Sequence, residues 1–271
     1  TPLSVLSQFN RPLFTYFKQL FAQVSNPPID YIREELVTSL ETRLGHQQNI
    51  LTESPGHARQ LVLDTPFLTD EETASIKEMD ANGMSAETVD ITYDPDESLE
   101  AAVERVRAEA TDLATEHDIL VLSDREAGAD RIPIPSLLAT GGVHHHLTRN
   151  GLRNHVGLVV ESGDPRTVHH MATLVGYGAG AVNPYLAYQT IEDLVAGPDG
   201  ADVEDAIGAY VKALEDGLLK TMSKMGISTM ESYQGAQIFE AVGLDSDFVA
   251  EYFEGTENRT EGIQIEDIEA D

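Results

Sequence analysis

The sequence contains no cysteine, and only 5 of its 17 basic residues are lysine. Without cysteine, residues 1–271 can form no disulfide, no thiolate nucleophile, no cysteine-ligated iron–sulfur cluster and no cysteine-rich zinc site. No apolar run approaches the roughly 18 residues that a membrane-spanning helix needs, and the first residues lack the charged-then-apolar pattern of an export signal. The sequence therefore predicts a soluble, cytoplasmic protein.

Positive charge is also scarce. The chain carries 47 acidic residues against 17 basic ones, which gives a formal net charge of −30. Such a field repels nucleic acid and anionic membranes, so we expect neither as a partner. Self-repulsion of this size is screened at molar salt, where the Debye length is about 3 Å. Together with the excess of arginine over lysine, the charge favours a protein of a high-salt cytoplasm over a moderately acidic protein of an ordinary one.

Residues 1–55 are predicted to form an N-terminal helical arm. An apolar and aromatic run over Leu13–Phe21 has the spacing of a short packed helix. A second helix is predicted over Asp30–Leu44, with one apolar face made of Ile32, Leu36, Leu40 and Leu44. The arm is too small to form a core alone, so we expect it to dock on the rest of the chain or on neighbouring segments.

Residues 56–245 alternate short apolar strands with amphipathic helices, which is typical of βα units and a parallel sheet. The predicted strands are Gln60–Leu63, Ala86–Tyr93, Ile119–Ser123, His155–Glu161, Ala179–Tyr185 and Ile227–Glu231. The predicted helices are Thr69–Asn82, Glu97–His117, Pro135–Asn150, Pro165–Gly176, Thr190–Val195, Val203–Met225 and Gln234–Val242. This order suits an incomplete TIM-like barrel or an open doubly wound sheet. Residues 246–271 are expected to run from a last helix into an exposed acidic linker.

Five histidines, His144–His146 and His169–His170, are the obvious candidates for metal ligands. Consecutive helical residues are about 100° apart around the axis, so three in a row cannot converge on one ion. We expect them to serve mainly as hydrogen-bonding residues on helix faces. The glycines Gly176, Gly178 and Gly180 close a predicted helix and lead into a strand, which is the reverse of the order in a dinucleotide-binding loop and favours a C-cap.

Polar residues gather where the predicted strands end, and ligands of parallel α/β folds bind at this edge. They are Ser123, Asp124, Glu161, Ser162, Asp164, Asn183, Tyr185, Ser232, Tyr233 and Gln234. Asp164 before Pro165 is also a strong helix N-cap. Glu161 has no such structural role in the sequence, but a single carboxylate without a partner is only a weak acid–base candidate.

Two lysines, Lys220 and Lys224, lie four residues apart near the end of a predicted helix. Charge complementation at the helix C-terminus is the common role of such residues, and a phosphate or carboxylate contact is the alternative.

The segment SKMGISTMESYQGAQIFEAVGL, residues 223–244, resembles a segment of glutamate synthase. The arm from LSQFNRPLFTYF onward and the middle stretch IPSLLATGGVHHHLTRN to NPYLAYQTI are similar to the same family in the same order. Only about Ser75–Ala110 lacks the likeness. Because the chain also begins without methionine, the resemblance implies the central domain of a longer polypeptide, with a reduced βα-barrel-like fold.

The resemblance further implies two partner domains, a glutamine amidotransferase domain and an FMN-binding domain. Between them ammonia passes to 2-oxoglutarate, and reduction yields glutamate. FMN and an iron–sulfur cluster are expected in that parent enzyme and no cofactor in residues 1–271, because the family's catalytic and cluster cysteines have no counterpart here. The resemblance carries no catalytic residue and no metal ligand to this chain.

Small and hydroxyl side chains after the long predicted helix suit a polar, narrow passage or an interdomain surface. The interface or tunnel candidates are Lys224, Gly226, Ser228, Thr229, Ser232 and Gln237. A buried strand and helix of the core would explain the same residues. Two other functions stay open at this point: a self-contained small-molecule α/β enzyme that uses the strand ends, and a separate subunit of a split glutamate synthase.

The net charge generates a first testable prediction. The apparent unfolding temperature should rise steadily between about 0.1 M and 1 M KCl, because the Debye length falls over this range from about 10 Å to 3 Å. Thermal denaturation followed by circular dichroism measures this. An unfolding temperature that does not change with KCl would contradict the high-salt interpretation.

Overall fold

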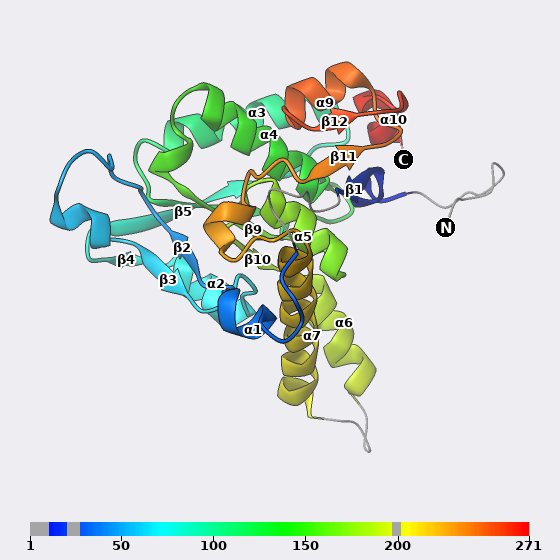
Figure 1. The fold of residues 1–271 in the computed structure, drawn as a ribbon. Coiled ribbons are helices and arrows are strands. Elements are labelled where there is room, and N and C mark those ends of the chain that lie inside the picture. Colours follow the sequence, from blue (N-terminus) through cyan, green and yellow to red (C-terminus); the bar gives the residue numbers. More distant parts are fainter. Residues whose placement is uncertain (1–10, 21–27, 197–201, 271) are drawn as a thin grey trace.

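A five-stranded sheet runs through the centre of the computed structural model, which describes residues 11–20, 28–196 and 202–270 (Figure 1). The strand order is β10-β9-β7-β5-β4. Four of these strands are parallel: β5 (Met84–Asp90), β7 (Ile119–Ser123), β9 (Gly157–Glu161) and β10 (Ala181–Asn183). The short β4 (Asp80–Ala81) pairs antiparallel with β5 at one edge. The predicted α/β fold with parallel βα units is confirmed.

Three helices connect the parallel strands and cover one face of the sheet: α3 (Leu99–Leu113), α4 (Ser136–Arg149) and α5 (Val168–Gly176). The parallel strands are neighbours in the order in which they occur in the chain. This progressive order is that of a βα-barrel segment, whereas the order of a doubly wound sheet reverses at a switch point. The barrel-like alternative therefore describes the sheet.

The opposite face of the sheet is covered by α2 (Asp70–Lys77) and by a hairpin of β2 (Thr42–Leu44) and β3 (Leu61–Leu63). Side chains alternate between the two faces, so Ile119 and Val121 meet this layer while Leu120 and Leu122 meet the helices. The predicted strand over residues 60–63 exists. Its assignment to the parallel sheet is wrong, because β3 pairs antiparallel with β2.

The N-terminal arm docks on the core, as expected. The 3₁₀ turn η1 (Leu13–Tyr16) and strand β1 (Phe17–Gln19) bury Leu13, Phe14, Tyr16 and Phe17 in the main hydrophobic cluster. The helix predicted over Leu13–Phe21 is wrong, because only a 3₁₀ turn forms and Phe17–Gln19 pairs as a strand with β11. Phe21, the end of that predicted helix, lies outside the described residues.

The predicted helix Asp30–Leu44 is wrong. Only α1 (Glu34–Val37) is helical, and the chain becomes extended at Thr38 before it enters β2. Leu40, Thr42 and Leu44 are buried. The spacing of two residues is that of a strand face, and the sequence suggested a helix because Leu40 and Leu44, four residues apart, fit either element.

Beyond β10 the chain forms α6 (Tyr185–Val195), α7 (Val203–Lys224), α8 (Met230–Tyr233) and β11 (Phe239–Ala241). The predicted strand Ile227–Glu231 and helix Gln234–Val242 are both wrong. Gly226 and Gly235 adopt left-handed backbone conformations that interrupt regular structure on each side of α8. Strand β11 forms because β1, from the distant arm, pairs with it antiparallel.

The C-terminal segment is folded onto the core as α9 (Ser246–Tyr252), β12 (Glu257–Asn258) and α10 (Ile265–Ala270). The expected exposed linker is therefore wrong, since Phe248 and Phe253 are buried. A Cβ on Gly141 of α4 would lie 2.6 Å from the Phe253 ring, so only glycine permits this contact. The division into an arm, a central unit and a C-terminal segment stays a prediction.

Short elements complete the chain: η2 (Pro55–Ala58), β6 (Thr92–Tyr93), β8 (Ile132–Pro133) and η3 (Arg153–His155). In the part of the chain that the structure describes, no helix combines the length and apolar character that crossing a membrane requires.

Candidate functional site

Four polar residues form one row across the parallel strands. Asp90, Ser123, Glu161 and Asn183 are the last residues of β5, β7, β9 and β10, and the strand register places each beside the next. All four lie on the face that packs against α2. Ile119 and Val121 of β7 lie on this face, and Ser123 follows Val121 by two residues. The register places Asp90, Glu161 and Asn183 level with Ser123 on the neighbouring strands. The row therefore stands at the edge of the sheet where parallel α/β proteins bind ligands.

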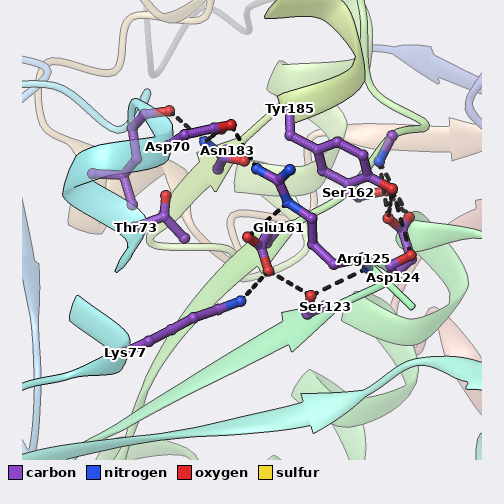
Figure 2. Close-up of polar contacts among 12 residues, drawn as sticks. Asp70, Thr73, Lys77, Ser123, Asp124, Arg125, Glu161, Ser162, Asn183 and Tyr185 are labelled. Atoms are coloured by element: carbon purple, nitrogen blue, oxygen red, sulfur yellow. Dashed lines mark hydrogen bonds and ion pairs between the residues drawn. The ribbon is translucent and has the colours of Figure 1, made fainter. Parts of the chain in front are cut away.

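Glu161 is the centre of this row (Figure 2). Its side chain is 5% exposed and forms ion pairs with Lys77 of α2 and with Arg125, whose Nε lies 3.1 Å from Oε1. The Ser123 hydroxyl donates a further hydrogen bond to Oε2. Both carboxylate oxygens are thus engaged, and the geometry favours a structural role for Glu161 over acid–base chemistry.

Arg125 joins Glu161 to a second carboxylate. Its guanidinium lies 2.7 Å from Asp70 Oδ2, and the Asn183 amide donates to Asp70 Oδ1 at 2.9 Å. Burial alone would lower the pKa of Arg125. The hydrogen bonds and negative charges of Asp70 and Glu161 outweigh the effect of burial, so the net result is a raised pKa. The guanidinium also stacks 4.1 Å from the centroid of the Tyr185 ring.

The cluster is balanced in charge, because Lys77 and Arg125 face Asp70 and Glu161. Both cations are already paired with carboxylates of the chain. A flavin phosphate needs unpaired cations or free backbone N–H groups at this position. The two cations of the cluster are therefore not free to hold such a phosphate, and the absence of cysteine excludes cysteine ligation of an iron–sulfur cluster by residues 1–271.

A second polar group lies next to this cluster. Asp124 accepts hydrogen bonds from the Ser162 hydroxyl, from the Gly163 N–H at 3.0 Å and from the Tyr185 hydroxyl at 2.7 Å. Burial raises the pKa of Asp124 and that of Tyr185. Both residues border a groove of about 530 Å³ whose walls are largely apolar and include Leu13, Tyr16, Ile134, Leu186, Ile263 and Ile268.

Asp164 has a different role from the one predicted. Helix α5 begins at Val168, and Thr167 rather than Asp164 is its N-cap. The Asp164 carboxylate instead accepts hydrogen bonds from the Ser136 N–H and hydroxyl, at 3.3 and 3.1 Å, at the start of α4. Burial raises its pKa.

The histidines are used in packing and hydrogen bonding. His144 Nδ1 accepts from Arg153 Nε at 2.9 Å, and burial lowers the pKa of His144 to about 2 and that of His145 to about 4. His169 Nε2 lies 2.9 Å from the Phe14 carbonyl oxygen, and His170 stacks on the Phe14 ring. Among residues 11–20, 28–196 and 202–270, no three histidines or carboxylates are placed to hold a metal ion.

The glycine-rich stretch has the C-cap geometry that its order predicts. Gly176 is the last residue of α5, and Gly178 has a positive φ of 110°. A Cβ on Gly180 would lie 2.3 Å from Leu44, so the glycine allows β2 to approach β10.

Five of the six predicted interface residues lie close together in the chain, around the end of α7 and α8. Lys224, Thr229 and Ser232 are exposed, and the Ser228 carbonyl accepts from the Ser39 N–H at 2.9 Å. The sixth, Gln237, borders a different cavity of about 370 Å³ that also contacts His144 and His145. Their proposed role stays a prediction.

The sequence reasoning missed Lys77, Arg125 and Asp70. Lys77 and Asp70 lie on α2, which meets Glu161 only through the tertiary fold, so spacing could not identify them. Two signals were present: Arg125 directly follows the predicted strand-end residue Asp124 after β7, and Lys77 is one of only 5 lysines in a chain of net charge −30.

Replacement of the central carboxylate should destabilise the fold. We expect Glu161→Gln to lower the free energy of unfolding by about 3 kcal/mol, because Lys77 loses its carboxylate partner and Arg125 keeps only Asp70. Glu126→Gln is the control, since Glu126 is exposed and has no ion pair within the described part of the chain. Urea denaturation measures both variants. A loss of unfolding free energy below about 0.5 kcal/mol for Glu161→Gln would contradict the proposed contribution of the cluster to stability.

Comparison with known proteins establishes the family. Residues 1–245 match the family model described as the glutamate synthase central domain. The chain is 44% identical over 269 residues to the glutamate synthase [NADPH] large chain of Bacillus subtilis, covering 98% of this chain and 18% of the relative. It is 45% identical over 278 residues to the glutamate synthase [NADH] of Schizosaccharomyces pombe, covering 99% and 13% respectively.

Among solved structures, one similar chain is the recombinant flavin-binding domain of baker's yeast flavocytochrome b2. The TM-score is 0.41 at 14% identity, over 49% of this chain and 32% of that one. The chain spans less than a fifth of the length of the glutamate synthases that it matches. The family match and these identities show that the chain belongs to the glutamate synthase family, and that it corresponds to the central domain of these proteins.

Proposed function

We propose that this chain is a connecting domain of a glutamate synthase, placed between a glutamine amidotransferase domain and an FMN-binding domain, and that it helps to direct ammonia between them. The observation that supports this most is the closed cluster around Glu161. The edge of the sheet at which related folds bind ligands is filled by paired charges. A domain of this kind contributes shape and surfaces to the enzyme, not reacting groups.

In this proposal the transfer of the glutamine amide nitrogen to 2-oxoglutarate occurs entirely outside residues 1–271. The amidotransferase nucleophile, the flavin and the iron–sulfur cluster belong to other parts of the polypeptide. The absence of cysteine and the poor fit of the strand ends to a phosphate both support this assignment. The isolated chain is therefore expected to form no glutamate.

A second candidate function is a self-contained small-molecule enzyme. One observation favours it: Asp124 and Asp164, both with pKa values raised by burial, border the 530 Å³ groove at the strand ends. Both carboxylates, however, already accept hydrogen bonds from Ser162 and Ser136. A third possibility, a separate subunit of a split enzyme, predicts co-purification with separately encoded, cysteine-bearing partners.

The ammonia-directing role is assigned to the segment from Lys224 to Ser232. Its side chains are small or hydroxylated at Gly226, Ser228 and Thr229, and Thr229 is exposed and donates to the Ser232 hydroxyl at 2.9 Å. Met225, Ile227 and Met230 of the same segment are buried in the core, so the segment is anchored by apolar side chains and presents its hydroxyl side chains at the surface. Such a polar edge suits a passage or a domain boundary. The surface position of Lys224 at the end of α7 is consistent with the same role.

A bulky residue in this segment should affect the two nitrogen sources differently. In the full-length enzyme, we expect Thr229→Phe to reduce glutamine-dependent glutamate formation several-fold more than ammonia-dependent formation, because only the first requires internal transfer. Thr190→Phe, on the exposed side of α6, is the matched control. Steady-state rates with each nitrogen source give the ratio, and equal losses would count against the role in ammonia transfer.

A further inference from the structure

The residues around α1 present apolar side chains to solvent. Tyr31, Ile32 and Leu36 are 85%, 75% and 84% exposed, and no residue of α1 is buried. Val37 is also exposed. Isolated exposed apolar residues are ordinary, but a cluster of four is a feature of interaction sites, all the more in a chain with a net charge of −30. We call these four residues the arm face.

The arm face is held in place by its backbone. The Ile29 N–H donates to the Ser223 carbonyl at 2.7 Å, and the Ser39 N–H donates to the Ser228 carbonyl at 2.9 Å. Between them, the Ser223 hydroxyl donates to the Glu34 carboxylate. A single helical turn is unstable alone, so these contacts are what maintain α1. The chain thus fixes an apolar turn on its surface without burying it.

The sequence pattern of the arm face is that of a buried helix face. Ile32 and Leu36 are four residues apart, which is the spacing of one helix face, although only Leu36 lies in α1 and Ile32 belongs to the turn before it. This spacing led to the prediction of a packed helix over residues 30–44, yet the described residues provide nothing that covers these two side chains. The apolar pattern is satisfied only if another surface packs on it.

A groove of about 520 Å³ begins at Ser39, two residues beyond the arm face. Its lining is mainly polar and includes Glu41, Arg43, Gln48 and His57 besides Ser39, Ile50 and Thr229. Ile50 is 91% exposed. Because Ser39 is bound to Ser228 and Thr229 lines the groove, the region reaches the predicted interface segment from Lys224 to Ser232. Two independent observations, the exposed apolar residues of the arm face and the predicted interface segment from Lys224 to Ser232, therefore place an interaction surface on the same side of the domain.

We infer that the arm face is a docking surface for a hydrophobic part of the same polypeptide that lies outside residues 1–271, with the polar groove at its border. The chain spans 18% and 13% of the two relatives quoted above, so most of such a polypeptide is available to cover it. The inference rests on the proposed function to the extent that the chain belongs to that longer enzyme. A second copy of the domain is the rival occupant.

The test is hydroxyl-radical footprinting of the full-length enzyme, with labelling of each side chain expressed relative to the same side chain in the urea-unfolded polypeptide. Tyr31, Ile32 and Leu36 should be labelled several-fold less than Leu194 of α6, which is 80% exposed in the domain. This protection should not change on dilution. Labelling equal to that of Leu194 would overturn the inference, and protection lost on dilution would assign the surface to a second copy and also overturn it.

A pair of variants separates docking from domain stability. Ile32→Ser/Leu36→Ser should raise labelling at Tyr31 several-fold in the full-length enzyme, whereas Leu194→Ser should leave it unchanged. Unchanged labelling in the double variant would count against the surface. Glutamate formation, measured in parallel, tests the proposed function separately: an enzyme that makes no glutamate but protects the arm face would refute that function and leave the docking surface standing.

Discussion

The ion-paired contact of Glu161 with Lys77 and Arg125 determines what the sheet edge can do. Glu161 is nearly inaccessible, and its position at the end of β9 places it in the middle of the polar row. Removing a buried carboxylate from water is costly unless cations and hydrogen bonds replace the lost hydration. The chain supplies two cations from α2 and from the loop after β7, and these same cations are then unavailable to a ligand.

The remaining architecture supplies surfaces around this closed edge. The N-terminal arm contributes Phe14 and Phe17 to the core, and the C-terminal segment contributes Phe253 through the space left by Gly141. Arg107, which is almost fully buried, holds α9 by an ion pair with Glu251 and also donates to the Gly142 carbonyl of α4. The arm and the C-terminal segment are thus tied to the βα unit by contacts between residues distant in sequence. Such a domain can position neighbouring domains without containing a reaction centre.

Much of the central unit could be predicted because its signals are local. The continuous apolar runs of β7 and β9, and the capped helices α3 before them and α5 after them, need no distant partner to be identified. The arm and residues 226–242 could not be predicted in the same way. Leu36 and Leu40 fit a helical stripe, but only Leu40 is buried, and β11 exists only because β1 pairs with it.

The same difference between local signals and distant partners applies to the site. Ser123, Glu161 and Asn183 were predictable as a group because parallel strands end together, but Lys77 and Asp70 reach them from α2 on the covering layer. Helix spacing does not specify which strand end a helix will meet. The sequence therefore located the edge of the sheet and left open whether that edge is available to a ligand or internally satisfied.

Titration of FMN into the purified chain tests this central claim most directly, because flavin fluorescence reports binding without requiring activity. We expect no saturable quenching, since the cations that would hold the flavin phosphate are paired with Glu161 and Asp70. Saturable quenching with one flavin bound per chain would show that the strand ends form an open site and would contradict it.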